Sequence, residues 1–238
     1  MKTTPTLNEL IYTVYHTVRT RVTLDEELAK DYIKFLIKAT RAKLIKQDAN
    51  KGYTIDSYVI QTLKCVELER IEASECCSGV SDCKLFRTKL QIPSVIELSH
   101  SQAIVRVGFV TQTDIPFDFV PYDKVPYLSF NRFSKNRIKC YLKDNDGYLY
   151  VIIPNDVKYK LLNKITISLV LEDPEAAAPF KDCSGNSCYT DNDTFPIKYN
   201  MVEAITSTVI EKFIKVASTA PSDINNNNKL DLDSPTEK

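Results

Sequence analysis

Apolar residues recur with helical spacing through the first third of the chain. Thr6 with Glu9, and Thr23 with Glu26, each fit the capping box, in which a threonine and a glutamate satisfy the first free amides of a helix. After the second box, apolar side chains recur every three or four residues to about Lys46. The same spacing predicts a third helix over residues 55–74. Its apolar stripe comprises Val59, Leu63, Val66 and Ile71.

The middle third changes to the period of a strand. Residues 104–110 are rich in β-branched and aromatic side chains, and residues 164–171 alternate between apolar and polar. Residues 138–142 and 148–153 flank an Asp-Gly pair, which is typical of a hairpin because the turn needs the positive φ that glycine tolerates. The prolines between residues 116 and 126 indicate a loop or a sheet edge. This region is predicted to form a small antiparallel sheet or an open barrel.

The chain returns to helical spacing over residues 200–218, where the apolar stripe comprises Met201, Ile205, Val209, Phe213 and Val216. Residues 221–238 are polar and rich in asparagine. Ordering such a segment costs about 1–2 kcal/mol of backbone entropy per residue, and it has few apolar anchors to offset this cost. We expect it to be ordered only by contact with another subunit or a neighbouring protein.

These patterns predict an α+β protein. The expected division is a helical region over residues 1–98, an antiparallel β region over 99–180, and a C-terminal helix with an extended docking tail over 181–238. The three regions together match the composition of an ordinary globular protein, with 43% hydrophobic and 26% charged residues.

Composition argues against several functions. Only five of the 238 residues are glycine, and they are too scattered to form a loop that cradles phosphate. The two histidines, His16 and His100, lie in no catalytic or metal-binding motif. Lys and Arg number 31 and so do Asp and Glu, so the net charge gives no simple argument for binding to nucleic acid or to an anionic membrane. No run of about 18 apolar residues occurs, so no segment is expected to span a bilayer. We therefore expect no enzyme, no catalytic residue and no cofactor.

The seven cysteines are expected to be reduced, because the first residues do not resemble a secretory signal and an odd number cannot pair completely. They form two clusters, Cys76-Cys77-Cys83 and Cys183-Cys188, whose spacing departs from that of zinc loops. We expect the first cluster to pack unligated at the junction of helix and sheet, with no metal. A zinc-stabilised regulatory domain and a redox-labile disulfide are the alternatives.

A basic stretch precedes and enters the predicted hairpin. Cations interleaved with aromatic side chains suit a nucleic-acid strand, so a nucleic-acid-binding module is a second alternative function. The zero net charge favours a solvated hairpin face instead. The stretch comprises Arg132, Lys135, Arg137, Lys139 and Lys143, with Phe133 and Tyr141. Elsewhere, residues 191–193 resemble part of a calcium loop but lack its downstream glutamate, so a turn is expected.

Three segments resemble structural proteins of crAss-like and related tailed bacteriophages that infect Bacteroidetes. They are residues 75–93, which contain the first cysteine cluster, residues 193–201, which lead into the last helix, and the start of the polar tail at 221–226.

This resemblance implies a structural ring protein of the head-to-tail connector, between the portal vertex and the tail. It implies a homo-oligomeric ring, taken as a dodecamer, that contacts the portal and neighbouring ring or tail proteins. Viral DNA would pass through the channel without sequence-specific binding, and no membrane would be involved. The protein would be part of the virion, assembled in the host cytoplasm. No catalytic residue comes with this resemblance.

Overall fold

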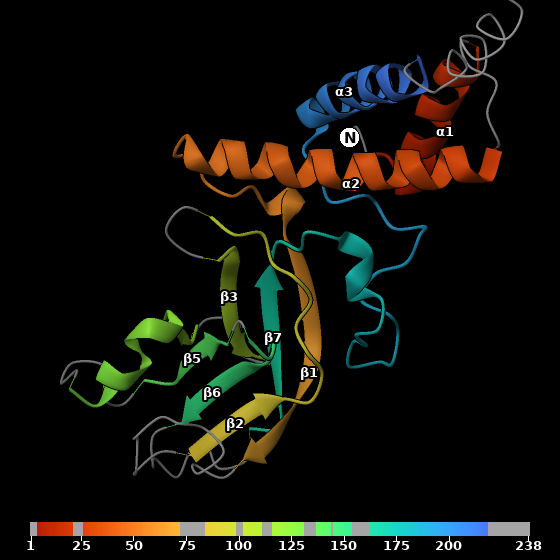
Figure 1. Ribbon diagram of the computed structural model, residues 1–238. Coiled ribbons are helices and arrows are strands. Elements are labelled where there is room, and N and C mark those ends of the chain that lie inside the picture. The colour runs from red at the N-terminus through yellow and green to blue at the C-terminus, as the bar shows by residue number, and fades with distance from the viewer. Residues whose placement is uncertain are drawn as a thin grey trace, which may run out of the picture.

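The computed structural model describes residues 4–20, 26–71, 84–98, 102–110, 116–130, 137–143, 145–153 and 162–218. A layer of three helices lies against one end of a strongly curved sheet (Figure 1). The helices are α1 (Leu7–Arg19), α2 (Glu26–Asn50) and α3 (Tyr199–Ser218). The predicted α+β class is therefore confirmed.

The first helix begins where the sequence predicts. The Thr6 hydroxyl accepts a hydrogen bond from the Glu9 amide at 3.2 Å, and the Thr6 amide donates to the Glu9 carboxylate at 2.8 Å, which completes the capping box. The second predicted box lies mostly outside the described residues. In α3, the expected stripe from Met201 to Phe213 is buried, but Val216 is exposed.

Seven strands form one mixed sheet in the order β3-β7-β1-β2-β6-β5-β4, in which β4 and β5 are parallel and the other neighbours antiparallel. The sheet is nearly closed as a barrel, because the Phe117 amide before β4 donates to the Val107 carbonyl of β3 at 2.7 Å. The strands are β1 (Gln61–Ile71), β2 (Lys84–Thr88), β3 (Ile104–Phe109), β4 (Asp118–Phe119), β5 (Lys139–Leu142), β6 (Leu149–Ile153) and β7 (Lys164–Leu169).

The predicted hairpin is β5 and β6, and its turn contains Gly147 with φ of 69°. Every residue of both strands is buried, so the hairpin has no solvated face. One face points into the barrel. The other face packs Tyr141 and Tyr150 against Val125 of a 3-10 segment, η2 (Tyr122–Phe130).

The helix predicted over residues 55–74 is wrong, because Gln61–Ile71 form the strand β1. Leu63 and Val66 are both buried against β7, and the register shifts between them at a bulge where Cys65 has φ of 54°. Side chains of a regular strand alternate between its two faces, and a bulge inserts one extra residue into this alternation. It therefore places the buried side chains three positions apart, which imitates a helical stripe.

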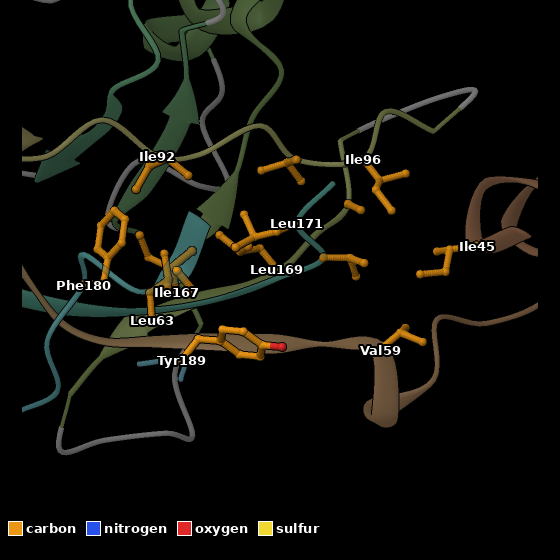
Figure 2. Packing of buried hydrophobic residues seen from close by; sticks show 14 of the residues in the cluster. Ile45, Val59, Leu63, Ile92, Ile96, Ile167, Leu169, Leu171, Phe180 and Tyr189 are labelled. Atoms are coloured by element: carbon orange, nitrogen blue, oxygen red, sulfur yellow. The ribbon is translucent and has the colours of Figure 1, made fainter. Parts of the chain in front are cut away.

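The helical layer and the barrel share one core. Its members come from all three helices and from both halves of the sheet, and Ile45 of α2 lies near Val59 and Ile96 at the end of the barrel (Figure 2). Because buried residues of both layers belong to one cluster, we expect the two layers to unfold together.

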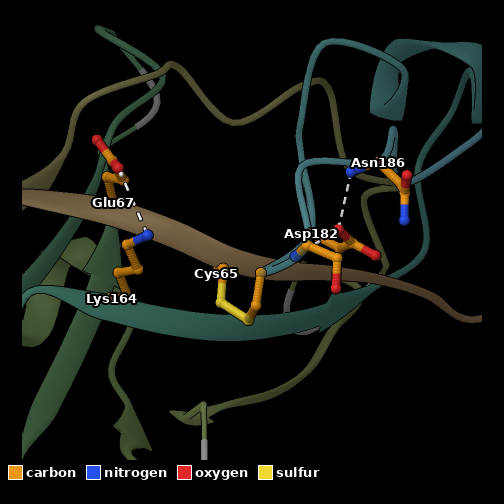
Figure 3. Close-up of a disulfide and its surroundings, with 7 residues drawn as sticks. Cys65, Glu67, Lys164, Asp182 and Asn186 are labelled. Carbon is orange, nitrogen blue, oxygen red and sulfur yellow. Dashed lines mark hydrogen bonds and ion pairs between the residues drawn. A yellow bond between two sulfur atoms is a disulfide. The ribbon is translucent and has the colours of Figure 1, made fainter.

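One pair of cysteines departs from the expectation of free thiols. Cys65, at the bulge of β1, forms a disulfide with Cys183, 118 residues later in the chain (Figure 3). The expectation of free thiols was based on the cellular compartment and on the spacing of nearby cysteines. Neither of these can predict a contact between residues that are distant in the sequence. Cys140 and Cys188 are free. The first cysteine cluster, Cys76-Cys77-Cys83, lies outside the described residues, as does the tail over 221–238.

The disulfide predicts a specific cross-linked peptide. After alkylation of the unreduced, denatured protein, digestion should yield one product that joins the peptides of Cys65 and Cys183, leaving at most five free thiols of the seven. Cys183→Ser should lower the free energy of unfolding by about 2–4 kcal/mol, because the unfolded chain regains the freedom of a long loop. Cys188→Ser is the matched control. Seven alkylated thiols without reductant would contradict the pairing.

Candidate assembly surface

The side chain that joins the two layers is Arg41 of α2, which is fully buried. Its guanidinium donates to the carbonyl of Pro196 at 2.8 Å, to that of Leu171 at 2.6 Å and to that of Val59 at 3.4 Å. These carbonyls belong to the segment before α3, the residues after β7 and the residues before β1. One planar cation therefore joins the start of β1 and the end of β7, which are neighbours at the same end of the sheet, to the helical layer.

Burial of this cation has a measurable electrostatic cost. Desolvation lowers the pKa of Arg41 to about 10, although the charge of Asp173 acts in the opposite direction. Tyr189, nearby, has its pKa raised to about 12 by burial, so it stays neutral. At neutral pH Arg41 is charged, and its backbone hydrogen bonds offset the loss of water.

Sequence reasoning missed Arg41, although a signal exists. Ile33, Ile37 and Ile45 form a buried stripe on α2. Arg41 belongs to the same stripe, because it lies four residues after Ile37 and four before Ile45. A charged residue in register with a buried stripe indicates a buried, hydrogen-bonded cation rather than a surface charge.

A second group of charges reinforces the same junction. Lys38 of α2 forms ion pairs with Asp173 at 2.7 Å and with Glu175, and Lys34 pairs with Glu175 at 2.6 Å. Both acids belong to the turn that follows β7. Burial alone would disfavour charge on Glu175, but hydrogen bonds from Lys34 and Lys38 outweigh it and hold the pKa of Glu175 below its usual value.

Three exposed tyrosines lie at the end of the helical layer that this junction positions. Tyr53, Tyr58 and Tyr199 have exposed fractions of 63%, 65% and 54%, and we call them the tyrosine patch. Tyr53 lines a shallow pocket together with Val59 and Lys198, the sequence neighbours of the other two. Of the three tyrosines, Tyr53 lines the recess itself, and Tyr58 and Tyr199 are adjacent in the sequence to residues that line it.

Exposed tyrosines grouped in this way suit a protein interface. Each offers a large apolar ring, a hydroxyl group and only two rotatable bonds to fix, so tyrosine is enriched at the centre of interfaces. The small recess beside Tyr53 is also lined by Ile45 and Met201, which are both buried.

The basic stretch of the sequence is only partly described. Arg132, Phe133 and Lys135 lie outside the described residues. Arg137 contacts Asp118 at 3.4 Å, Lys139 is buried, and Lys143 lies 3.4 Å from Asp146. Tyr141 is fully buried and stacks on Tyr150 with ring centroids 5.1 Å apart, so it cannot stack on a base.

The remaining candidate chemistry is sparse in the part of the chain that the structure describes. There, no group of three or more His, Cys, Asp or Glu side chains is placed to hold a metal ion, and no helix could span a membrane. Burial raises the pKa of the Cys140 thiol, so it stays protonated at neutral pH. Residues 191–193 form the expected turn, in which Asp193 accepts hydrogen bonds from Thr190.

The ion pairs of Glu175 predict that the stability of the protein depends on pH. The folded state lowers the pKa of Glu175, so its contribution is present above the ordinary value of 4.5 and is lost as the pH falls through the lower folded value. Glu175→Gln should lower the free energy of unfolding by about 1–2 kcal/mol at pH 7. The difference from the wild type should shrink at pH 3 to 4. Urea unfolding at both pH values measures it.

Glu203→Gln is the matched control, because Glu203 is exposed on α3 and its replacement should change stability by less than about 0.5 kcal/mol at either pH. A Glu175→Gln defect that persists unchanged at pH 3 would contradict the ionic origin of the contribution.

Comparison with known proteins identifies the family. The sequence model of a crAss-like phage family described as phage tail ring protein 2 matches residues 9–233, which is nearly the whole chain. No curated protein matches. The matched range includes α1 from its third residue, all of α2 and α3, all seven strands and the tyrosine patch, together with most of the polar tail. The chain therefore belongs to the phage tail ring protein 2 family.

Proposed function

We propose that this protein is a structural subunit of a ring in the connector between the portal vertex and the tail of a crAss-like phage. The match over residues 9–233 to a family of phage tail ring proteins carries this proposal. The family places the protein in the virion as a component of the tail. The finer position, beside the portal and around the DNA channel, is our inference from the resemblance of the sequence to connector proteins.

The ring is a homo-oligomer, which we take to be a dodecamer, with neighbouring ring or tail proteins above and below. A ring of identical subunits needs two different surfaces on each subunit that fit each other. The tyrosine patch is suited to be one of them, because the buried junction at Arg41 holds the helices that carry it against the barrel. DNA would pass through the channel without being read.

The role is structural rather than catalytic. The support is the rigid, hydrogen-bonded junction and the exposed aromatic patch, which are features of an assembly protein. Assembly of the ring would take place in the host cytoplasm. Electron microscopy of virions should show copies of the chain in a ring between portal and tail, and a location elsewhere would contradict the proposal.

The tyrosine patch gives a direct test of the interface. Replacement of Tyr53, Tyr58 and Tyr199 together by serine should weaken ring formation at least about tenfold, because buried tyrosines carry much of the energy of an interface. The melting temperature of the unassembled protein should change by only a few degrees, since all three side chains are exposed. Mass photometry of the purified full-length protein measures assembly.

Tyr127→Ser is the control, because Tyr127 is 68% exposed on η2, away from the helical layer. If the triple variant forms rings at the same concentration as the wild type, the tyrosine patch is not an interface.

The polar tail gives a second test. A chain that ends at residue 220 should fold, because the described residues of the barrel and the helical layer share one large core. It should fail to assemble into complete particles, because the tail provides contacts to another subunit. Circular dichroism checks the fold, and complementation of a phage that lacks the protein checks assembly. Complete particles from the truncated chain would contradict this role of the tail.

A further inference from the structure

A groove of about 450 Å³ lies on the outer face of the barrel, across strands β3, β7 and β1. The register places Arg106 opposite Ser168 and Ser168 opposite Thr62, while Gly108 lies opposite Thr166. The floor is therefore made of glycine and small hydroxyl residues. Because these side chains are short, the sheet is hollowed between the larger residues at its margins.

The groove is basic. Lys64 and Arg106 line it, and no acidic side chain does so among the described residues. Asp182 precedes Cys183 in the sequence and keeps a charged carboxylate, because backbone hydrogen bonds from Asn186 at 2.9 Å and Ser184 at 2.8 Å, together with the charge of Lys64, lower its pKa. An anion in the groove therefore shares Lys64 with Asp182. The hydroxyl groups of Thr62 and Ser168 hydrogen-bond to each other at 3.2 Å, so one of the two hydroxyl hydrogens remains to donate to a carboxylate.

The wall of the groove is held in place covalently. Cys183 lines the groove, and its disulfide to Cys65 ties the loop of residues 181–188 to the bulge of β1 (Figure 3). A wall that is fixed before binding loses little conformational entropy when a ligand enters, so the groove is preorganised.

We propose that this groove binds the acidic end of the polar tail, around Leu230 to Asp233, from a second copy of the chain. In an extended segment, Asp231 and Asp233 point to the same side about 7 Å apart. They would face Lys64 and Arg106. Residues 219–238 carry four acidic and two basic side chains, so the charges are complementary. The family match extends to residue 233 and therefore includes this segment.

We take the tail in the groove to come from a second copy of the chain. A contact between two different surfaces, here a tail and a sheet face, can repeat from one subunit to the next and close into a ring. Asp231 and Asp233 are 13 and 15 residues after the end of α3, so an extended tail could carry them about 43–50 Å, which is enough to reach an adjacent subunit. This inference rests on the proposed ring function and adds which surface receives the tail.

Photo-cross-linking of the full-length protein tests the inference. A benzoylphenylalanine replaces Val110 at the margin of the groove, and this unlabelled variant is mixed with wild-type protein grown on heavy isotopes. We expect residue 110 of the unlabelled variant to cross-link to an isotope-labelled peptide from residues 219–238 of the wild-type protein. The same probe at Leu90, which is exposed and does not line the groove, should give no such product. Cross-links only to the same copy, to another segment or to nothing would overturn the inference.

Charge reversal supplies the second arm. Lys64→Glu with Arg106→Glu should reduce the cross-link about tenfold or more, and Asp231→Lys with Asp233→Lys in the partner should restore it. Lys124→Glu with Lys212→Glu, two exposed residues outside the groove, should leave it unchanged. Mass photometry of the same samples separates the two proposals. If rings form without the cross-link, the proposed contact between tail and groove is wrong and the proposed ring function is unaffected. If no rings form, the ring function itself is contradicted.

Discussion

A buried guanidinium holds this protein together at its centre. Arg41 donates to three backbone carbonyls from segments 18, 130 and 155 residues away in the sequence. Removing the charge from water is unfavourable, and it lowers the pKa of Arg41 to about 10, so the site is stable only because those hydrogen bonds are made together. The ends of β1 and β7, the start of α3 and the helix α2 therefore have a fixed relation to one another.

That relation determines what the molecule can present to partners. The tyrosine patch lies on segments that Arg41 and the Lys34–Lys38–Glu175 cluster hold against the barrel, so its geometry is set before any partner binds. On the barrel itself, the disulfide at Cys65 fixes the wall of a basic groove. Rigid surfaces on both layers suit a subunit that must repeat identically around a ring, because little conformational freedom is lost at each contact.

The sequence was informative where structure is determined locally. The capping box at Thr6 and the Asp-Gly turn depend on neighbouring residues, and both were predicted correctly. The bulge at Cys65 is the reason that the helix predicted over residues 55–74 is wrong, because one extra residue gives the strand an apolar spacing like that of a helix. The disulfide and two of the three hydrogen bonds of Arg41 join residues more than 100 positions apart, so no local pattern contains these contacts. The tyrosine patch likewise depends on the packing of α3 against α2.

The central claim is that Arg41 makes the helical layer and the barrel one cooperative unit. Chemical unfolding of Arg41→Met, compared with Lys43→Met at an exposed position of the same helix, measures it most directly. The account predicts that Arg41→Met lowers the free energy of unfolding by about 3–5 kcal/mol, because buried carbonyls lose their partner, and that Lys43→Met changes it by less than about 0.5 kcal/mol. Equal stability of the two variants would contradict the account.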